Sequence, residues 1–282
     1  MINKLISYLL DIRDRQRMTI ALAKGGAMMQ ARAIDLKRPC TWEFSGFSQN
    51  GEDGILDVLS KQLLSSNRYF IEIGSSDGMQ NNSSWLVVAE QYDGLMIEGD
   101  SRLAERGQRL ITGYSVGVDY LNMFVDSENI QKLRGLSQYS DPDIFSLDID
   151  GVDYYIAKEI ISGGFRPKIF VVEYNSVYGK ERSVTVPYRK NFAFSEAHSS
   201  RLYYGVSIAA WRKFFESIGY KFVTVDRKGV NAFFIDPACY SSDFVKEIQG
   251  LDYAENQFQY RKFKVPSEQQ FDLIKDQEFV GV

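Results

Sequence analysis

The sequence predicts an α/β fold in which a mostly parallel β-sheet is covered by helices on both faces. Short apolar runs rich in β-branched and aromatic residues alternate with longer stretches of helical period, as in strand–helix–strand units. The chain has 282 residues and is 44% hydrophobic, which suits one large domain with additions. In its last third, two β-rich runs flank a short turn, which predicts an antiparallel hairpin after the parallel strands.

Composition narrows the class of protein. The net charge is −4, the pI is near 5.3, and lysine and arginine are dispersed, so a nucleic-acid partner is not expected. Cys40 and Cys239 lie far apart and have no metal-ligand spacing, which favours free thiols in a reducing cytoplasm. Because the apolar stretches are short, we expect no transmembrane segment.

Residues 1–43 are predicted to form a helical arm. Its first apolar residues fall on one helical face, a charged turn follows, and a second apolar patch covers 18–22. We expect this helix to pack on the domain or on a second subunit, which would make a homo-oligomer. An interfacial membrane helix is the alternative, but the strong basic face of such helices is lacking. The first patch consists of Ile2, Leu5, Ile6, Leu9 and Leu10.

The next elements are predicted in chain order. Ser48 is expected to cap a helix that has acidic residues in its first turn and a buried face between 55 and 63. The third strand is ambiguous, because 116–119 and 121–126 also qualify. A helix over 204–216 precedes the hairpin, and residues 240–282 have no clear period. We therefore expect a main domain at 44–238 and a surface appendage at 239–282. Strands are predicted at 69–73, 94–98, 114–118, 143–148, 168–174, 220–225 and 230–235.

The first strand carries the first chemical motif. It contains Glu72 and runs into a loop with the spacing Gly74-x-x-x-Gly78, over which a nucleoside-type cofactor can lie. The second strand ends in Glu98, which is placed to accept hydrogen bonds from two ribose hydroxyls. A dinucleotide site needs Gly-x-Gly-x-x-Gly, and Asp77 would repel a pyrophosphate. The loop instead resembles the first motif of class I S-adenosylmethionine (SAM) methyltransferases.

A second motif lies at the ends of the fourth and fifth strands. Asp148 and Asp150 project to one side, and Glu173 and Asn175 alternate in the same way on the next strand. Ligands of open α/β sheets bind beside this edge, so the four side chains should converge. Their oxygens suit Mg²⁺, Mn²⁺ or Ca²⁺ better than zinc. The alternatives are metal-free base catalysis or acids that serve turns and caps, the role expected of Asp153.

The chain has a single histidine, His198, in a polar segment before the last predicted helix. It could act as a general base or a metal ligand, or it could be solvated and structural. The segment 179–201 is long for a connection between strand and helix, which is typical of a lid. With its arginines and Tyr188, it is predicted to order over a hydroxylated and perhaps anionic acceptor. A surface excursion without substrate contact is the alternative.

Several motifs together resemble the FkbM-type branch of SAM-dependent methyltransferases over roughly 44–236. They are Ser48-Gln-Asn-Gly-Glu-Asp, Phe70-Ile-Glu-Ile-Gly-Ser-Ser-Asp-Gly, Ile97-Glu, Asp148-Ile-Asp-Gly-x-Asp and Val172-Glu-Tyr-Asn. The resemblance implies a seven-stranded sheet and a SAM-dependent O-methyltransferase acting on a hydroxyl of a sugar or related small-molecule or glycan acceptor. The metal positions are also similar to those of Mg²⁺-dependent macrolide-sugar O-methyltransferases. Those enzymes carry adjacent aspartates where this chain has Glu173-Tyr-Asn175.

Residue roles follow from the resemblance. The loop residues are expected to surround the methionine end of SAM, Glu98 to bind the ribose and Asp119 to bind the adenine amine. The base is expected to be Asp150 or His198, with Asp148 beside it. Methylation of an amide nitrogen or a phosphoryl group, and a catalytically degenerate binding module, remain as alternatives. The loop set comprises Glu72, Gly74, Ser75, Ser76, Asp77 and Gly78.

Overall fold

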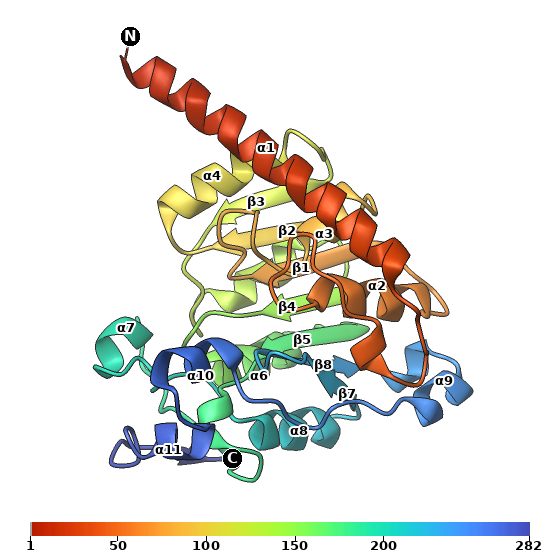
Figure 1. The fold of residues 1–282 in the computed structure, drawn as a ribbon. Helices are drawn as coiled ribbons and strands as arrows, with labels where there is room; N and C mark the ends of the chain where they lie inside the picture. The colour runs from red at the N-terminus through yellow and green to blue at the C-terminus, as the bar shows by residue number, and fades with distance from the viewer. Residues whose placement is uncertain (1) are drawn as a thin grey trace.

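The computed structural model describes residues 2–282, with side chains from residue 8 onward, and its centre is a seven-stranded sheet (Figure 1). The strand order is β3-β2-β1-β4-β5-β8-β7; the first five strands are parallel, and β8 runs antiparallel to both of its neighbours. This confirms the predicted α/β fold with its hairpin. The strands are β1 Tyr69–Ile73, β2 Asp93–Glu98, β3 Val118–Asn122, β4 Ile144–Leu147, β5 Ile169–Glu173, β7 Lys221–Val225 and β8 Asn231–Ile235.

The strand order determines where a ligand can bind. The chain enters the sheet at β1, moves outward through β2 to β3, and then crosses back to β4 on the other side of β1. The loops that leave β1 and β4 therefore diverge, and a crevice opens at the carboxyl edge of the sheet between them.

Both faces of the sheet are buried, which explains why its central strands are mostly apolar. In β1, Ile71 and Ile73 contribute to the core on one face, and Phe70 contributes to the core on the other. Helices α6 and α8 cover the first face, while α1, α2, α3, α4 and α9 cover the second. Their bounds are α1 Ile2–Ala31, α2 Glu52–Lys61, α3 Ser84–Val88, α4 Ser101–Ile111, α6 Asp153–Ser162, α8 Ile208–Ser217 and α9 Ser242–Glu247.

Two local predictions were wrong. Strand β3 occupies Val118–Asn122, across both predicted alternatives, because the turn after α4 takes up the residues before it and leaves Val116 fully exposed. The N-cap of α2 is Gly51, with φ +102°, instead of Ser48. The Ser48 hydroxyl still accepts a hydrogen bond from the N–H of Asp53, at 3.0 Å, inside the first turn.

The N-terminal arm is one continuous helix, α1, and Figure 1 shows its first turns extending beyond the sheet. Its second half packs on the domain, where Met18 is buried and a Cβ on Gly25 would lie 2.4 Å from the Trp85 ring. The predicted first apolar patch lies partly outside the described side chains. Of the rest, Leu9 is exposed and Leu10 partly so. Within residues 2–282, none of the helices has the length and apolar character needed to cross a membrane.

Residues 239–282 differ from the expected surface appendage. Strand β9 pairs with β6, and Ile274 is buried in the core. The rings of Phe271 and Phe279 pack against Tyr178. These are contacts between segments distant in sequence, which local periodicity does not reveal. The added elements are α10 Gln257–Phe263, α11 Ser267–Phe271, β6 Val184–Thr185, β9 Val280–Gly281, the short α5 Leu133–Leu136 and α7 Phe194–Ala197, and the 3₁₀ turns Pro39–Thr41, Ile130–Lys132, Ser176–Tyr178 and Pro237–Cys239.

Candidate active site

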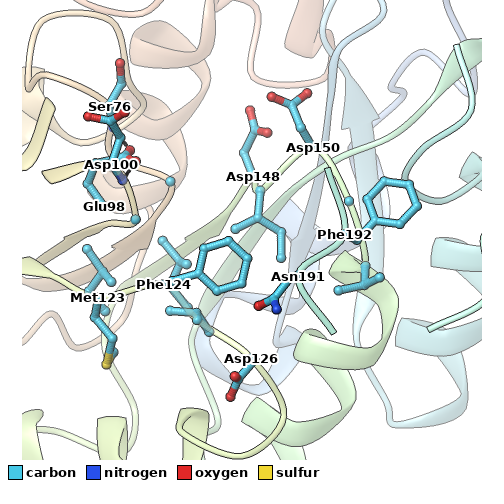
Figure 2. Close-up of a pocket in the computed structure, with 18 of the residues that line it drawn as sticks. Ser76, Glu98, Asp100, Met123, Phe124, Asp126, Asp148, Asp150, Asn191 and Phe192 are labelled. Atoms are coloured by element: carbon cyan, nitrogen blue, oxygen red, sulfur yellow. Dashed lines mark hydrogen bonds between the residues drawn. The ribbon is translucent and has the colours of Figure 1, made fainter. Parts of the chain in front are cut away.

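Two cavities lie at the carboxyl edge of the sheet. The first, of about 410 Å³, is bounded by the loops after β1, β2, β3 and β4 and by residues 188–192. Figure 2 shows Ser76 and Glu98 on one side of it and Asp148 and Asp150 on the other. The second, of about 350 Å³, shares both aspartates with the first. A molecule in one cavity can therefore approach a molecule in the other at these two carboxylates.

The glycines of the loop after β1 serve different purposes. Gly74 has φ +87° and lines both cavities, and a Cβ there would lie 1.7 Å from the carbonyl oxygen of Asp148. Gly78 has φ +74° and packs on α4, where a Cβ would lie 3.0 Å from Ile111. Gly74 thus lets the loop approach the end of β4, whereas Gly78 fits the loop to its covering helix.

Glu98 connects the loops after β1 and β2. Its carboxylate accepts hydrogen bonds from the N–H of Ser76 and the N–H of Asp100, each at 2.8 Å. Ser76 has φ +54°, so this bond stabilises an uncommon backbone conformation. A carboxylate has about four acceptor positions, and Glu98 lines the first cavity. It can therefore still accept bonds from a ligand's hydroxyls.

Other predicted cofactor residues lie outside both cavity linings. The Asp77 carboxylate pairs with Arg106 on α4, at 2.7 Å, and Ser75 is fully buried. Asp119 lies within β3 with its side chain exposed. The cavity instead reaches past the end of β3, where Met123, Phe124, Val125 and Asp126 line it. The displaced strand boundary explains why the sequence indicated Asp119.

Three carboxylates meet where the two cavities join. Single oxygen atoms of Asp148, Asp150 and Glu173 all lie within 4.8 Å of one another. Burial, followed by the charge of Asp150, holds the pKa of Asp148 well above its usual range. Burial, followed by the charge of Asp148, does the same to the pKa of Glu173. Protons or a cation must relieve this repulsion, and the hard oxygen donors fit a divalent cation.

Asn175 was predicted as a fourth ligand, and the structure places it elsewhere. Its amide nitrogen donates to the carbonyl oxygens of Leu202 and Tyr204, at 2.8 and 3.0 Å, and its amide oxygen accepts from the N–H of Val177. Asn175 is buried and lines neither cavity. Its role is to hold the chain that carries Tyr204, whose hydroxyl lies 3.4 Å from the Glu173 carboxylate.

Asp153 shapes the turn that carries Asp150. Its carboxylate accepts hydrogen bonds from the N–H groups of Ile149 and Gly151, both at 2.9 Å. The N-cap of α6 is Val152, so Asp153 reaches back from the first turn and is not the cap. Burial raises its pKa to about 6. Asp150, at φ +51°, is held in the left-handed region by this arrangement.

His198 does not reach the carboxylates. Its Nδ1 lies 2.8 Å from the hydroxyl of Ser200, and the residue lines neither cavity. It follows the short helix α7, and the backbone turns there so that the ring engages its own segment. The structure thus does not bring the predicted base to the predicted acids.

The long segment before α8 covers the first cavity instead of the second. Residues 188–192 line the first cavity. The hydroxyl of Tyr188 lies 2.7 Å from that of Ser127, and Lys190 pairs with Glu128 at 2.7 Å. The segment therefore bridges to the loop after β3.

The second cavity is lined by segments for which the sequence predicted other roles. Residues 48–52 were interpreted only as a helix start, 230–231 as a hairpin, and 256 and 258 as part of the appendage. Glu72 also lines this cavity and is buried near the carboxyl end of β1. Asn50 and Asn231 are buried there, and amide side chains in such positions need hydrogen-bond partners.

No family model and no curated protein matches this chain. Solved structures do match. An O-methyltransferase from Bacillus cereus in complex with S-adenosylhomocysteine (SAH) is 14% identical with a TM-score of 0.44, covering 78% of this chain and 89% of that one. The O-methyltransferase TomG from Streptomyces achromogenes, in complex with SAM, is 17% identical with a TM-score of 0.39, covering 64% and 76%. At such identities and TM-scores, function has to be argued from the site.

Proposed function

We propose that the chain is a SAM-dependent O-methyltransferase, which binds SAM in the first cavity and a hydroxylated acceptor in the second. One observation carries the proposal: Glu98, at the end of β2, is fixed by the N–H groups of Ser76 and Asp100 with its carboxylate in the cavity. A fixed carboxylate at this position matches the two vicinal hydroxyls of a ribose, each of which can donate a charge-assisted hydrogen bond.

The residues that line the first cavity suggest the remaining contacts with SAM. The glycine turn at Gly74 and the backbone at Ser76 would lie along the methionine end. Beyond Glu98, the apolar side chains of Met123 and Phe124 would hold the adenine, and Asp126 would accept a bond from its amine. Asp126 thus takes the role expected of Asp119.

The charge of the first cavity favours SAM over a dinucleotide. Five carboxylates and two basic side chains line it. A pyrophosphate would meet net negative charge there, whereas the sulfonium of SAM is a cation. The carboxylates are Glu98, Asp100, Asp126, Asp148 and Asp150, and the bases are Arg189 and Lys190.

The reaction is an in-line displacement: the acceptor oxygen attacks the methyl carbon, the carbon–sulfur bond breaks, and SAH leaves. Catalysis consists of alignment and of removing the hydroxyl proton. Asp148 and Asp150 border both cavities, so one of them would take that proton. A divalent cation held by these two residues and Glu173 would lower the pKa of the acceptor hydroxyl.

Turnover assays test the proposal. The protein is incubated with SAM, with and without Mg²⁺, and a panel of monosaccharides, and SAH release and acceptor mass are followed. We expect methylated product, lost in Asp150→Asn and retained in His198→Gln. Absence of SAM binding would overturn the proposal. SAM binding without any methylated product would favour the binding-module alternative, and product from an amide or phosphorylated acceptor alone would favour another methylated atom.

A further inference from the structure

The C-terminal segment 253–259 is hydrogen-bonded to the chain that leaves the end of β5. The Tyr253 hydroxyl donates to the carbonyl oxygen of Ser176 at 2.8 Å, and the N–H of Asn256 donates to the Ser176 hydroxyl at 2.9 Å. Glu173, a member of the acidic cluster, is the last residue of β5. The C-terminal segment therefore holds the backbone just beyond an acid of the site.

A second connection reaches the Glu173 side chain itself. The amide nitrogen of Gln259, on α10, donates to the hydroxyl oxygen of Tyr204 at 3.2 Å, and that hydroxyl lies 3.4 Å from the Oε1 of Glu173. The Oε1 of Gln259 lies 3.5 Å from the Ser176 hydroxyl, which keeps the amide nitrogen toward Tyr204. A phenol has one proton to donate, and with an N–H donor already at its oxygen that proton is left for the carboxylate.

The backbone of Tyr204 is anchored independently of its hydroxyl. Tyr204 is 6% exposed, and its carbonyl oxygen accepts hydrogen bonds from the hydroxyl of Tyr178, at 2.7 Å, and from the amide nitrogen of Asn175, at 3.0 Å. Because two donors share this carbonyl oxygen, the backbone keeps one anchor if either donor is removed. The phenol thus extends from a fixed backbone and presents a fixed donor to Glu173.

We propose that Tyr204 and Gln259 are positioning residues, which hold the Glu173 carboxylate beside Asp148 and Asp150 so that the three acids can bind one divalent cation. This deepens the proposed function and rests on it. Carboxylates whose oxygens lie within 4.8 Å of one another repel, which favours rotation of the glutamate away from the aspartates. A fixed donor at Glu173 opposes that rotation, as hydrogen bonds to metal ligands do in general. The C-terminal segment, which the sequence predicted as a surface appendage, thus takes part in the site.

Separate calorimetric titrations with Mn²⁺ and with SAH test this proposal. Tyr204→Phe should lower the affinity for Mn²⁺ about two- to ten-fold, as the loss of one hydrogen bond provides, and leave SAH affinity unchanged. Tyr203→Phe is the matched control: this neighbouring buried tyrosine donates to the backbone carbonyl oxygen of Glu278, so Mn²⁺ affinity should be retained. Gln259→Met should lower Mn²⁺ affinity by itself but have no further effect together with Tyr204→Phe, because both act through one hydroxyl.

The outcomes separate the two proposals. No SAH binding by the wild type would overturn the proposed function, whatever the Mn²⁺ result. SAH binding without Mn²⁺ binding, or equal Mn²⁺ affinity in Tyr204→Phe and the wild type, would overturn this inference and not the methyltransferase. Equal losses in Tyr204→Phe and Tyr203→Phe, or additive losses in the double variant, would also overturn it, because the effects would then come from general packing. Gln259 is half-buried, so Gln259→Met tests the connection even if Tyr204→Phe does not fold; unchanged Mn²⁺ affinity there would again overturn the inference.

Discussion

The carbonyl oxygen of Asp148 lies so close to Gly74 that a Cβ on the glycine would stand 1.7 Å from it. The loop after β1, which is proposed to hold the cofactor, thus contacts the backbone that carries the acidic cluster. The separation between cofactor and acids is therefore determined by the main chain, which is the most rigid way to align a methyl donor with a base.

Gly74→Ala should be far more damaging than the same change at Gly164. The two glycines have nearly equal φ values, +87° and +88°, but nothing lies within 4 Å of a Cβ on Gly164. Gly164→Ala should cost about 1–2 kcal/mol of unfolding free energy, from the left-handed backbone alone. Gly74→Ala adds a backbone collision and should also abolish SAH binding. Urea unfolding measures the free energy of unfolding, and calorimetry measures SAH affinity. If Gly74→Ala and Gly164→Ala lost equal unfolding free energy, the close contact at Gly74 would be contradicted.

The pH dependence of stability reports on Glu72. Burial raises its pKa from 4.5 to about 7, so the folded protein holds a proton that the unfolded chain has released. The free energy of unfolding should therefore fall as pH rises through this window, by about 3 kcal/mol from this residue. Glu72→Gln should flatten that decline. Urea unfolding at about pH 5 and about pH 8 compares the two proteins; parallel slopes would show that Glu72 ionises normally in the fold.

The sequence predicted the sheet well because its signals are local. Buried parallel strands are mostly apolar along their length, and the glycine loop and the Asp148–Asp150 pair directly follow such strands. Strand β3 was misplaced because edge strands are only half buried. An exposed Val116 then looks like a strand residue. The shifted strand leaves Asp119, the predicted adenine partner, outside the lining of the first cavity.

The rest of the site depends on long-range packing. Asn175 follows β5 at the alternating spacing expected of a ligand, yet its amide nitrogen donates to the carbonyl oxygens of residues 202 and 204. His198 engages Ser200 through its local turn. The second cavity combines residues 48–52 with 256 and 258, segments whose proximity no periodic pattern encodes.

Binding of Mn²⁺ should depend on three carboxylates and not on Asn175. Asp150→Asn and Glu173→Gln should each lower the affinity for Mn²⁺, because each removes a charged oxygen donor. Asn175→Ala should lower the melting temperature through its lost backbone contacts while leaving ion affinity intact. Because the carboxyl pKa values are raised, the affinity should fall with decreasing pH. Calorimetric titration with Mn²⁺ measures these affinities. Loss of Mn²⁺ binding in Asn175→Ala would show that Asn175 is a fourth ligand, as the sequence predicted.

The segment over the first cavity should act on cofactor affinity. Tyr188→Phe removes the hydroxyl contact with Ser127. It should weaken SAH binding by about 0.5–1.5 kcal/mol, or about two- to ten-fold in Kd. Phe258→Ala, in the second cavity, should lower acceptor kcat/KM with unchanged SAH affinity. Parallel SAH titrations and acceptor kinetics separate the two effects. If Tyr188→Phe instead lowered acceptor kcat/KM and Phe258→Ala weakened SAH binding, residues 188–192 would contact the acceptor and not the cofactor.

The most direct measurement of the central claim is calorimetric titration of SAH into the wild type, Glu98→Ala and Asp119→Ala. We predict that the wild type binds and that Glu98→Ala loses two charge-assisted hydrogen bonds, about 3 kcal/mol or more, which weakens SAH at least about 100-fold. Asp119→Ala should bind as the wild type does, because its side chain lies outside the cavity. Undiminished affinity in Glu98→Ala, or no binding by the wild type, would contradict the account.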